Sequence, residues 1–222
     1  MRKRNFTLVE LLVVIGIIGI LAGLIIPAVV ISKQKGRITK ARADMSSLST
    51  VFTRMDGECG MMKAAGSSNY QLGGVSWGGP DSNGSVTIGK LSSNKYDSST
   101  VDDYCKVIAE LADPKNSGVT VSVNKRKTPY LDARPEYDRS KSCTADANKA
   151  NTWLDPWGNP YLIRINVHHE EKNTNPAVSN STVPLKVILW SLGPDGKGDI
   201  GTVGDKTNRD NIAGWKDGDW FD

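Results

Sequence analysis

The chain has 222 residues, and its 28 Lys and Arg against 24 Asp and Glu give a net charge of +4. This length fits one domain with an appendage and is too short for a multidomain enzyme. This net charge is too small for a protein that coats nucleic acid. Three of the positive charges are Arg2, Lys3 and Arg4 at the N-terminus, so the rest of the chain carries very little net charge. No nucleophile motif such as Gly-x-Ser-x-Gly is present, so the sequence gives no reason to expect an enzyme.

The first element is an apolar segment, residues 11–31, which holds 21 positions without a charged side chain. As a helix it spans about 31 Å, the thickness of the hydrocarbon core of a bilayer. An ordinary secretory signal has an apolar core of only about 7–15 residues and a small-x-small cleavage site. The longer segment predicts a retained single-pass anchor. The basic N-terminus predicts that this end stays in the cytoplasm and that the rest of the chain lies outside it.

Glu10 stands at the edge of the apolar segment. A carboxylate carried into the bilayer without a partner costs about 2.5–3.5 kcal/mol. No Lys or Arg follows within the segment, so one candidate partner is a new α-amino group, formed if the chain is cut before Phe6. The alternative is that Glu10 extends to the membrane interface and needs no partner.

Residues 5–15, Asn-Phe-Thr-Leu-Val-Glu-Leu-Leu-Val-Val-Ile, resemble the class III signal of type IV pilins and type II secretion pseudopilins. The resemblance implies that a prepilin peptidase cuts between Asn5 and Phe6 and that Phe6 is then methylated. It also implies that Glu10 pairs with the amine of a neighbouring subunit during filament assembly. Asn5 stands where the family usually has Gly. Pro27 resembles the mid-helix proline of the family, and a proline there removes one helical hydrogen bond and permits a kink.

An apolar stripe with helical spacing follows the membrane segment, and it predicts a helix that continues to about Met55. We expect this face to pack against the C-terminal domain. The stripe consists of Ile38, Ala41, Met45, Leu48, Phe52 and Met55. The other face is basic, and it either attracts anionic lipid headgroups or is a solvated helix surface. Its cations are Lys33, Lys35, Arg37, Lys40 and Arg42.

The middle of the chain, residues 57–150, is longer than is usual for the family that the N-terminus resembles. Its Gly- and Ser-rich first part predicts loops with one short strand at 85–88. A helix is expected at 99–111, because a capping pattern precedes its apolar stripe and Pro114 follows it. Alternating valines predict a strand at 119–123, before a polar loop.

Few residues of the exported part indicate a binding chemistry. Cys59, Cys105 and Cys143 permit one disulfide in an oxidising compartment, but an odd number does not reveal which two pair. His168 and His169 would point to opposite faces of a strand, so we expect surface residues rather than a metal site. Residues 125–127, Lys-Arg-Lys, with nearby Tyr130, are the one candidate patch for DNA, and exposed basic turns of this kind are usually just solvated.

The C-terminal part combines a tight-turn sequence at 153–160 with two predicted strands, at 161–167 and 183–191. A loop rich in Gly and Asp follows the second strand. Calcium takes six to eight oxygen ligands, and glycines let backbone carbonyls turn inward at little steric cost. The spacing is not that of an EF-hand. The composition alone therefore leaves two interpretations, a calcium site or Asp-Gly turns without a metal.

The segments at 155–161, 190–196 and 210–215 resemble the major, G-type pseudopilin of type II secretion, which binds one calcium in its C-terminal loop. The resemblance implies that calcium stabilises the subunit and permits assembly. The implied ligands are the Leu192 carbonyl, Asp195, Asp210 and Asn211. Asn211 stands where the family commonly has a second Asp. Two further carboxylates of the loop, Asp199 and Asp205, are candidates to replace the missing charge.

Together these features predict an α+β, pilin-like fold, with a long N-terminal helix packed on a small antiparallel sheet and a calcium loop at the C-terminus. The expected regions are the leader 1–5, the membrane and assembly helix 6–31, its amphipathic extension 32–56, the variable region 57–150 with a helix near 100–112, and the sheet and cation loop 151–222.

The resemblance implies a pseudopilin of a type II secretion system, held in the bacterial inner membrane with its C-terminal domain in the periplasm. Expected partners are further copies in a filament, the prepilin peptidase, minor pseudopilins and the assembly proteins of the inner membrane. The alternative is a minor or type IV pilin that serves adhesion or DNA uptake. We do not expect nucleic-acid binding.

Overall fold

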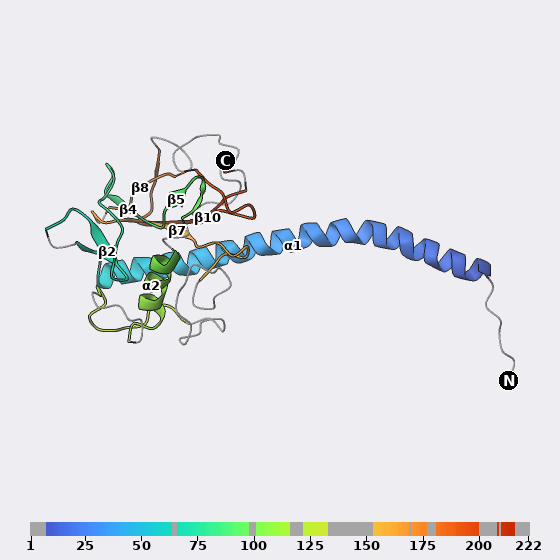
Figure 1. Ribbon diagram of the computed structural model, residues 1–222, viewed down its shortest axis with the longest axis horizontal. Coiled ribbons are helices and arrows are strands. Elements are labelled where there is room, and N and C mark those ends of the chain that lie inside the picture. Colours follow the sequence, from blue (N-terminus) through green and yellow to red (C-terminus); the bar gives the residue numbers. More distant parts are fainter. Residues whose placement is uncertain are drawn as a thin grey trace. The chain divides into compact units, whose positions relative to one another are not determined.

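The computed structural model describes residues 8–63, 66–97, 101–115, 122–132, 153–168, 170–176, 181–199, 208 and 210–215. The fold is α+β, as predicted, with one long N-terminal helix and several small antiparallel sheets (Figure 1). The chain divides into an N-terminal unit, Met1–Lys40, and a C-terminal unit, Ala41–Asp222. Helix α1, Leu8–Glu58, contributes residues to both units.

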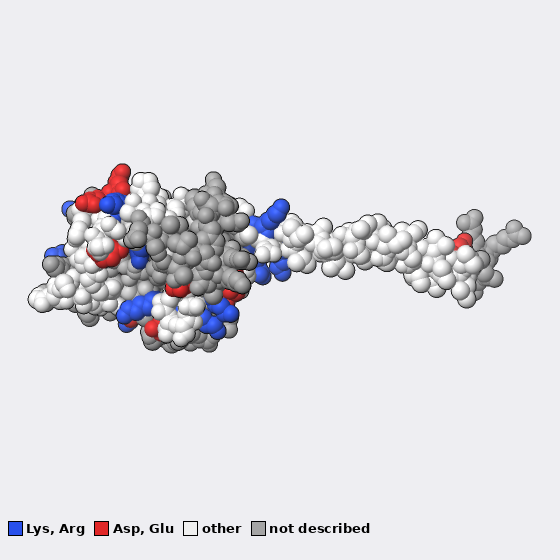
Figure 2. Space-filling model, turned by 90° about the horizontal axis from the view of Figure 1, so that it is seen from above, with Lys and Arg blue, Asp and Glu red and all other residues white. Residues whose placement is uncertain are grey.

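In the N-terminal unit, α1 exposes its apolar side chains on every side. Its large apolar residues between Leu8 and Ile31 are 46–79% exposed. The helix is long and apolar enough to cross a membrane, and it continues through Pro27. The uncharged stretch that follows Glu10 is visible as the white part of the helix in Figure 2. In the described part of the chain, nothing buries the apolar side chains of this region.

In the C-terminal unit, α1 buries five of the six residues of the predicted stripe, whereas the sixth, Ile38, belongs to the N-terminal unit and is only half-buried. Met45 lies beside Gly214, where an added Cβ would come within 3.1 Å of the Met45 Cβ. The helix ends three residues beyond the predicted end, because Gly60 takes the left-handed conformation (φ +68°) that closes a helix. The backbone N–H groups of residues 59 and 60 both donate to the Met55 carbonyl. The buried side chains are those of Ala41, Met45, Leu48, Phe52 and Met55.

The central sheet has four antiparallel strands in the order β11-β10-β7-β4. Their bounds are Ile212–Ala213, Val187–Ser191, Leu162–Asn166 and Ser85–Ile88. Ile165 of β7 pairs with Val187 of β10 on one side and with Val86 of β4 on the other. The strand β4 therefore joins the variable region to the C-terminal part.

The strand predicted at 161–167 is confirmed as β7, and all five residues of β7 are buried. The reason is its place between β10 and β4, where even polar side chains must find partners inside the protein. Arg164 donates from Nε to Thr87 Oγ1 (2.9 Å) and from Nη1 to the Thr174 carbonyl (3.0 Å). Burial lowers the pKa of the Arg164 guanidinium.

The single strand predicted at 183–191 is wrong, because the structure has two. Strand β9, Thr182–Val183, pairs with β8, Asn173–Thr174, while β10 begins at Val187. Pro184 separates them, and proline has no N–H for a ladder. The Asn173 side chain donates to the carbonyls of Leu185 and Lys186 (2.6 and 2.7 Å). The Lys186 carbonyl also accepts from the Asn166 N–H of β7 (2.9 Å).

The variable region holds more strands than predicted. Its strand at 85–88 and its helix α2, Val101–Ala112, are confirmed. The predicted capping residues of that helix, and most of the predicted strand at 119–123, lie outside the described residues, while Ser122 and Val123 are not in a strand. The strands not predicted are β1, Met62–Lys63; β2, Tyr70–Leu72; β3, Val75–Ser76; β5, Leu91–Ser92; and β6, Lys95–Tyr96.

A buried carboxylate, Glu110 of α2, holds three parts of the variable region together. It accepts hydrogen bonds from the Gly73 backbone N–H (2.7 Å), from the Ser122 hydroxyl and, more weakly, from the Asn124 N–H (3.5 Å). Gly73 belongs to the turn between β2 and β3, and a Cβ there would lie 2.7 Å from the Val107 backbone nitrogen. Glycine is therefore required for the turn to approach α2.

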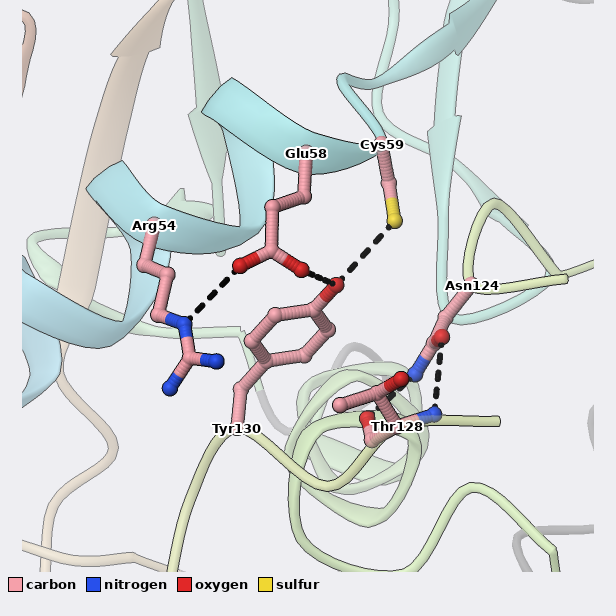
Figure 3. Close-up of polar contacts among 6 residues, drawn as sticks. All are labelled: Arg54, Glu58, Cys59, Asn124, Thr128 and Tyr130. Atoms are coloured by element: carbon pink, nitrogen blue, oxygen red, sulfur yellow. Dashed lines mark hydrogen bonds and ion pairs between the residues drawn. The ribbon is translucent and has the colours of Figure 1, made fainter. Parts of the chain in front are cut away.

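The C-terminal end of α1 is tied to the segment 122–132 by the polar contacts in Figure 3. Tyr130 donates to Glu58 Oε2 (2.9 Å) and lies 3.3 Å from the Cys59 sulfur, while Arg54 donates to Glu58 Oε1 (2.9 Å). Hydrogen bonds from Arg54 and Tyr130 lower the pKa of Glu58. Burial, with contacts to Cys59 and Glu58, raises the pKa of Tyr130.

The described residues include two of the three cysteines and one of the two histidines. Cys59 is half-buried and Cys105 is buried, and they do not pair with each other. Cys143 lies outside the described residues, so its pairing stays a prediction. His168 is exposed just after β7, as predicted, and His169 lies outside the described residues.

Candidate functional site

The predicted processing and assembly residues are all near the start of the chain. Asn5 and Phe6, on either side of the predicted cut, lie outside the described residues. Glu10 stands exposed in the first turn of α1, next to the uncharged stretch. Pro27 lies inside the helix, which shows no break there.

The predicted turn at 153–160 is built around Asp155. Its carboxylate accepts from the backbone N–H groups of Trp157 (3.0 Å) and Asn159 (2.7 Å), and from the Ser191 hydroxyl (2.6 Å). Asp155 is buried, and burial raises the pKa of its carboxyl against the opposing effect of these hydrogen bonds. Because Ser191 is the last residue of β10, Asp155 fixes the start of the loop that follows this strand.

The loop after β10 turns tightly and packs closely on the segment around residue 210. Gly193 has φ +67°, and a Cβ there would lie 2.8 Å from the Asp210 carbonyl carbon. Its carbonyl accepts from the Asn159 side chain (3.0 Å), and its N–H donates to Ser191 Oγ (3.0 Å). Glycine is needed at this position for both the conformation and the contact.

Two predicted ligands, Asp195 and Asp210, lie side by side. The Asp195 backbone N–H donates to Asp210 Oδ2 (3.1 Å), and the Lys197 N–H donates to Asp195 Oδ1 (2.8 Å). Burial raises the pKa of Asp210, and the nearby Asp195 charge raises it further. Two carboxylates that repel each other in this way are an arrangement that a bound cation stabilises.

Asn208, which the sequence analysis did not select, organises the rest of the loop. Its fully buried side chain donates to the Asp199 carbonyl (2.9 Å) and accepts from the Asp199 N–H (2.7 Å). These two bonds fix the orientation of the Asn208 amide. Asp199 is thus held through its backbone. Asn208 Oδ1 also accepts from Asn211 Nδ2 (2.9 Å), which brings Asn211 under the loop.

The Asn211 side chain lies between Asn208 and two backbone carbonyls of the loop. With the amide nitrogen toward the carbonyls, it donates to that of Lys197 (2.9 Å) and to that of Leu192 (3.0 Å), and these bonds need no metal. With the nitrogen turned the other way, it donates to Asn208 Oδ1 instead (2.9 Å). The amide therefore lies close to the Leu192 carbonyl, with which it was predicted to share a calcium ion.

The residues of this loop therefore fit a hard cation in their chemistry. The structure brings together the Leu192 carbonyl with Asn211, and Asp195 with Asp210, whereas Asp205 lies outside the described residues. The Lys197 carbonyl is an oxygen that sequence reasoning missed, since backbone oxygens leave no mark in composition. In the described part of the chain, no three His, Cys, Asp or Glu side chains gather at one point. A cation here depends on amide and backbone oxygens.

The comparisons with known proteins concern the N-terminus. A family model described as the prokaryotic N-terminal methylation motif matches residues 1–26, which include the predicted cut and Glu10. No curated protein and no solved structure matches the chain. The motif is that of type IV pilin-like prepilins, and it implies processing by a prepilin peptidase, assembly into a filament and anchoring in the membrane through the N-terminus. It is a structural motif and not that of an enzyme class.

Proposed function

We propose that this protein is a pseudopilin subunit of a type II secretion system, and that its copies assemble into a periplasmic pseudopilus that drives protein export. The single observation that carries the proposal is the N-terminal methylation motif on a helix whose apolar surface is exposed on all sides. Such a surface needs a cover, and the two that suit this length are a bilayer and the helices of neighbouring subunits.

The C-terminal loop supports the choice of a major, calcium-dependent subunit. The proposed ligands are the Leu192 carbonyl and the side chains of Asp195, Asp210 and Asn211, with Asp199 and Asp205 as further candidates. The proposal is supported by the neighbouring carboxylates of Asp195 and Asp210, and by the Asn211 side chain beside the Leu192 carbonyl. Calcium would supply no catalysis here. It would link the end of β10 to the segment around residue 210 and stabilise the folded subunit.

The test of the subunit class is the mature N-terminus. In a cell with a prepilin peptidase, mass spectrometry should find a chain that starts at methylated Phe6. A chain that retains Met1, or one that is cut after the apolar segment, would contradict the proposal. A strain that lacks the secretion system's other components but keeps the peptidase is the control, since it should still process the chain yet form no pseudopilus.

A minor or type IV pilin, in adhesion or DNA uptake, is the second candidate. One observation favours it, a pocket of about 400 Å³ beside the end of α1, with exposed Lys125 and Arg126 next to Tyr130. DNA binding that weakens steeply with salt, and that is lost on replacing these two cations by Gln, would support uptake. Export that fails without the protein, and no DNA binding, would support the pseudopilin.

A further inference from the structure

Four cations follow the uncharged stretch of α1 within eight residues. They are Lys33, Lys35, Arg37 and Lys40, and all are exposed. After Glu10, the next acidic residue of the chain is Asp44. We call these four residues the basic collar. It places four positive charges, with no acidic residue among them, directly after the apolar stretch that is long enough to span a membrane.

The position of the basic collar along the helix corresponds to the headgroup layer of a bilayer. The uncharged residues 11–32 are about 33 Å long as a helix and fill the hydrocarbon core. The headgroup layer on each side is roughly 5–8 Å thick, which is the length of about four or five helical residues. When residues 11–32 span the core, Lys33, Lys35 and Arg37 therefore lie at the depth of the lipid phosphates, and Lys40 lies just outside.

Contrary to the expectation from the sequence, the cations do not all share one face of the helix, because Lys35 lies apart from the other three. At about 100° per residue, Lys33, Arg37 and Lys40 lie within an arc of about 60°, and Lys35 lies nearly opposite. In Figure 2, basic side chains are visible on opposite edges of the helix where the white stretch ends. A single protein neighbour contacts one side of a helix, whereas lipid headgroups surround it.

The position of these cations also conflicts with the usual charge bias of membrane proteins. Lys and Arg normally gather on the cytoplasmic side of a span, and here Arg2, Lys3 and Arg4 precede it while the basic collar follows it. Cations at both ends of the span weaken the charge bias that orients it. The basic collar is therefore not explained by membrane orientation, and we look for another function.

We propose that the basic collar binds the phosphate groups of anionic phospholipids, in the leaflet where the span ends. The anionic lipid surface is the partner, and charge complementarity at headgroup depth is the basis of recognition. The proposal requires only that the N-terminal helix is in a membrane. It does not depend on filament assembly, on the secretion system or on calcium.

The test measures which lipids surround the full-length protein in a bilayer. The protein is placed in phosphatidylcholine vesicles with a trace of spin-labelled phosphatidylglycerol or phosphatidylcholine, and the immobilised fraction of each label is compared. We expect phosphatidylglycerol to be enriched by roughly fivefold, the effect of one cation near an anionic surface, and to lose this enrichment in high salt. All proteins compared carry Arg2→Gln, Lys3→Gln and Arg4→Gln, so that cations flank the span at one end only. Changing Lys33→Gln, Lys35→Gln and Arg37→Gln together should then bring the ratio to about one.

Two matched variants separate the basic collar from net charge and from misfolding. Lys90→Gln, Lys125→Gln and Arg126→Gln remove the same charge from exposed positions elsewhere and should leave the enrichment unchanged. Lys33→Arg, Lys35→Arg and Arg37→Lys keep the charge and should keep the enrichment. Gln has nearly the helix propensity of Lys, so the helix itself is preserved. The proposal would be overturned if the protein with the intact basic collar showed no enrichment, or if the enrichment survived the change of Lys33, Lys35 and Arg37 to Gln. It would also be overturned if the change of Lys90, Lys125 and Arg126 to Gln caused an equal loss.

Discussion

Two apolar stretches of this chain have opposite surroundings. Between Leu8 and Ile31 the large apolar side chains are 46–79% exposed, whereas no apolar side chain of β10 is more than 3% exposed. The two stretches differ chiefly in length and in neighbours, since β10 has β7 and β11 beside it. The apolar composition of a segment therefore indicates only that its side chains must be kept from water. The length of the segment, and the other elements of the same chain that can pack on it, decide whether it is buried inside the protein or contacts a membrane or another subunit.

The largest expected effect concerns Glu10, in the region that depends on an external partner. Glu10→Gln keeps the shape and removes the charge that we propose to pair with a neighbouring subunit's amine. We expect filament yield to fall by about a hundredfold, since an unpaired charge in the membrane costs about 2.5–3.5 kcal/mol. Thermal unfolding of the C-terminal unit should not change. Glu58→Gln, on the same helix, is the control, and equal filament yields from the two variants would refute the assigned role.

The second prediction concerns Glu110, which belongs to the C-terminal unit, where the apolar side chains are buried within the protein itself. Glu110→Ala leaves the buried N–H of Gly73 without its acceptor and removes the acceptor of the Ser122 hydroxyl. We expect a loss of about 2–4 kcal/mol in the free energy of unfolding, measured with denaturant, and unchanged processing before Phe6. The control is Asp103→Ala on the same helix, which removes only a surface pair with Lys106 and should cost less than about 1 kcal/mol. Similar losses in both variants would show that Glu110 does not hold the region together.

We expect calcium to stabilise the C-terminal unit further. In full-length protein in detergent, calcium at one hundred times its dissociation constant should add about 2.7 kcal/mol to the stability. The rise in the unfolding midpoint should vanish in Asp195→Ala and in Asn211→Leu. Asn211→Asp adds the missing charge and should lower the calcium concentration needed. A midpoint that does not respond to calcium in metal-free protein would leave Asp-Gly turns as the better interpretation.

The smallest effect is the pH dependence of the metal-free loop. The folded state raises the pKa of Asp155 and Asp210, mainly through burial, so between the unfolded pKa of about 3.9 and the folded value the folded state binds more protons. Stability should therefore fall as the pH rises through this window. Asp210 is only half-buried, and solvent screening keeps its share small.

Denaturant unfolding across this pH window, in the presence of a chelator, measures the effect. Asp210→Asn should flatten the slope. With calcium bound the slope should reverse, because the ion favours the ionised carboxylates. A slope that is equal with calcium and with chelator would show that Asp210 does not bind the ion.

Features with local causes could be predicted from the sequence. The length of α1, its buried stripe from Ala41 to Met55 and the helix α2 follow from periodicity within one element. The two-residue strands β1, β3 and β5 could not be predicted, since their pairing depends on tertiary context and not on a pattern of their own.

The candidate site also has features that could be predicted from the sequence and features that could not. The Asp and Gly residues of its loop are visible in composition, and the turn around Asp155 was predicted from its prolines and glycine. The role of Asn208 was not, because it arises only where residues 199 and 211 meet in space. The Lys197 carbonyl belongs to the backbone and has no trace in residue type.

The order of the central sheet has a consequence for the time at which the protein folds. Strand β4 pairs with β7, about 75 residues later in the chain, and β10 pairs with β11 at residues 212–213. A chain that emerges from a ribosome or a membrane pore N-terminus first cannot complete this sheet until nearly all of it has appeared. Contacts between such distant residues form slowly, because a long loop must close first. Until then the aliphatic residues of β4 and β7 lack their packing partners, and unpaired apolar strands of this kind favour aggregation.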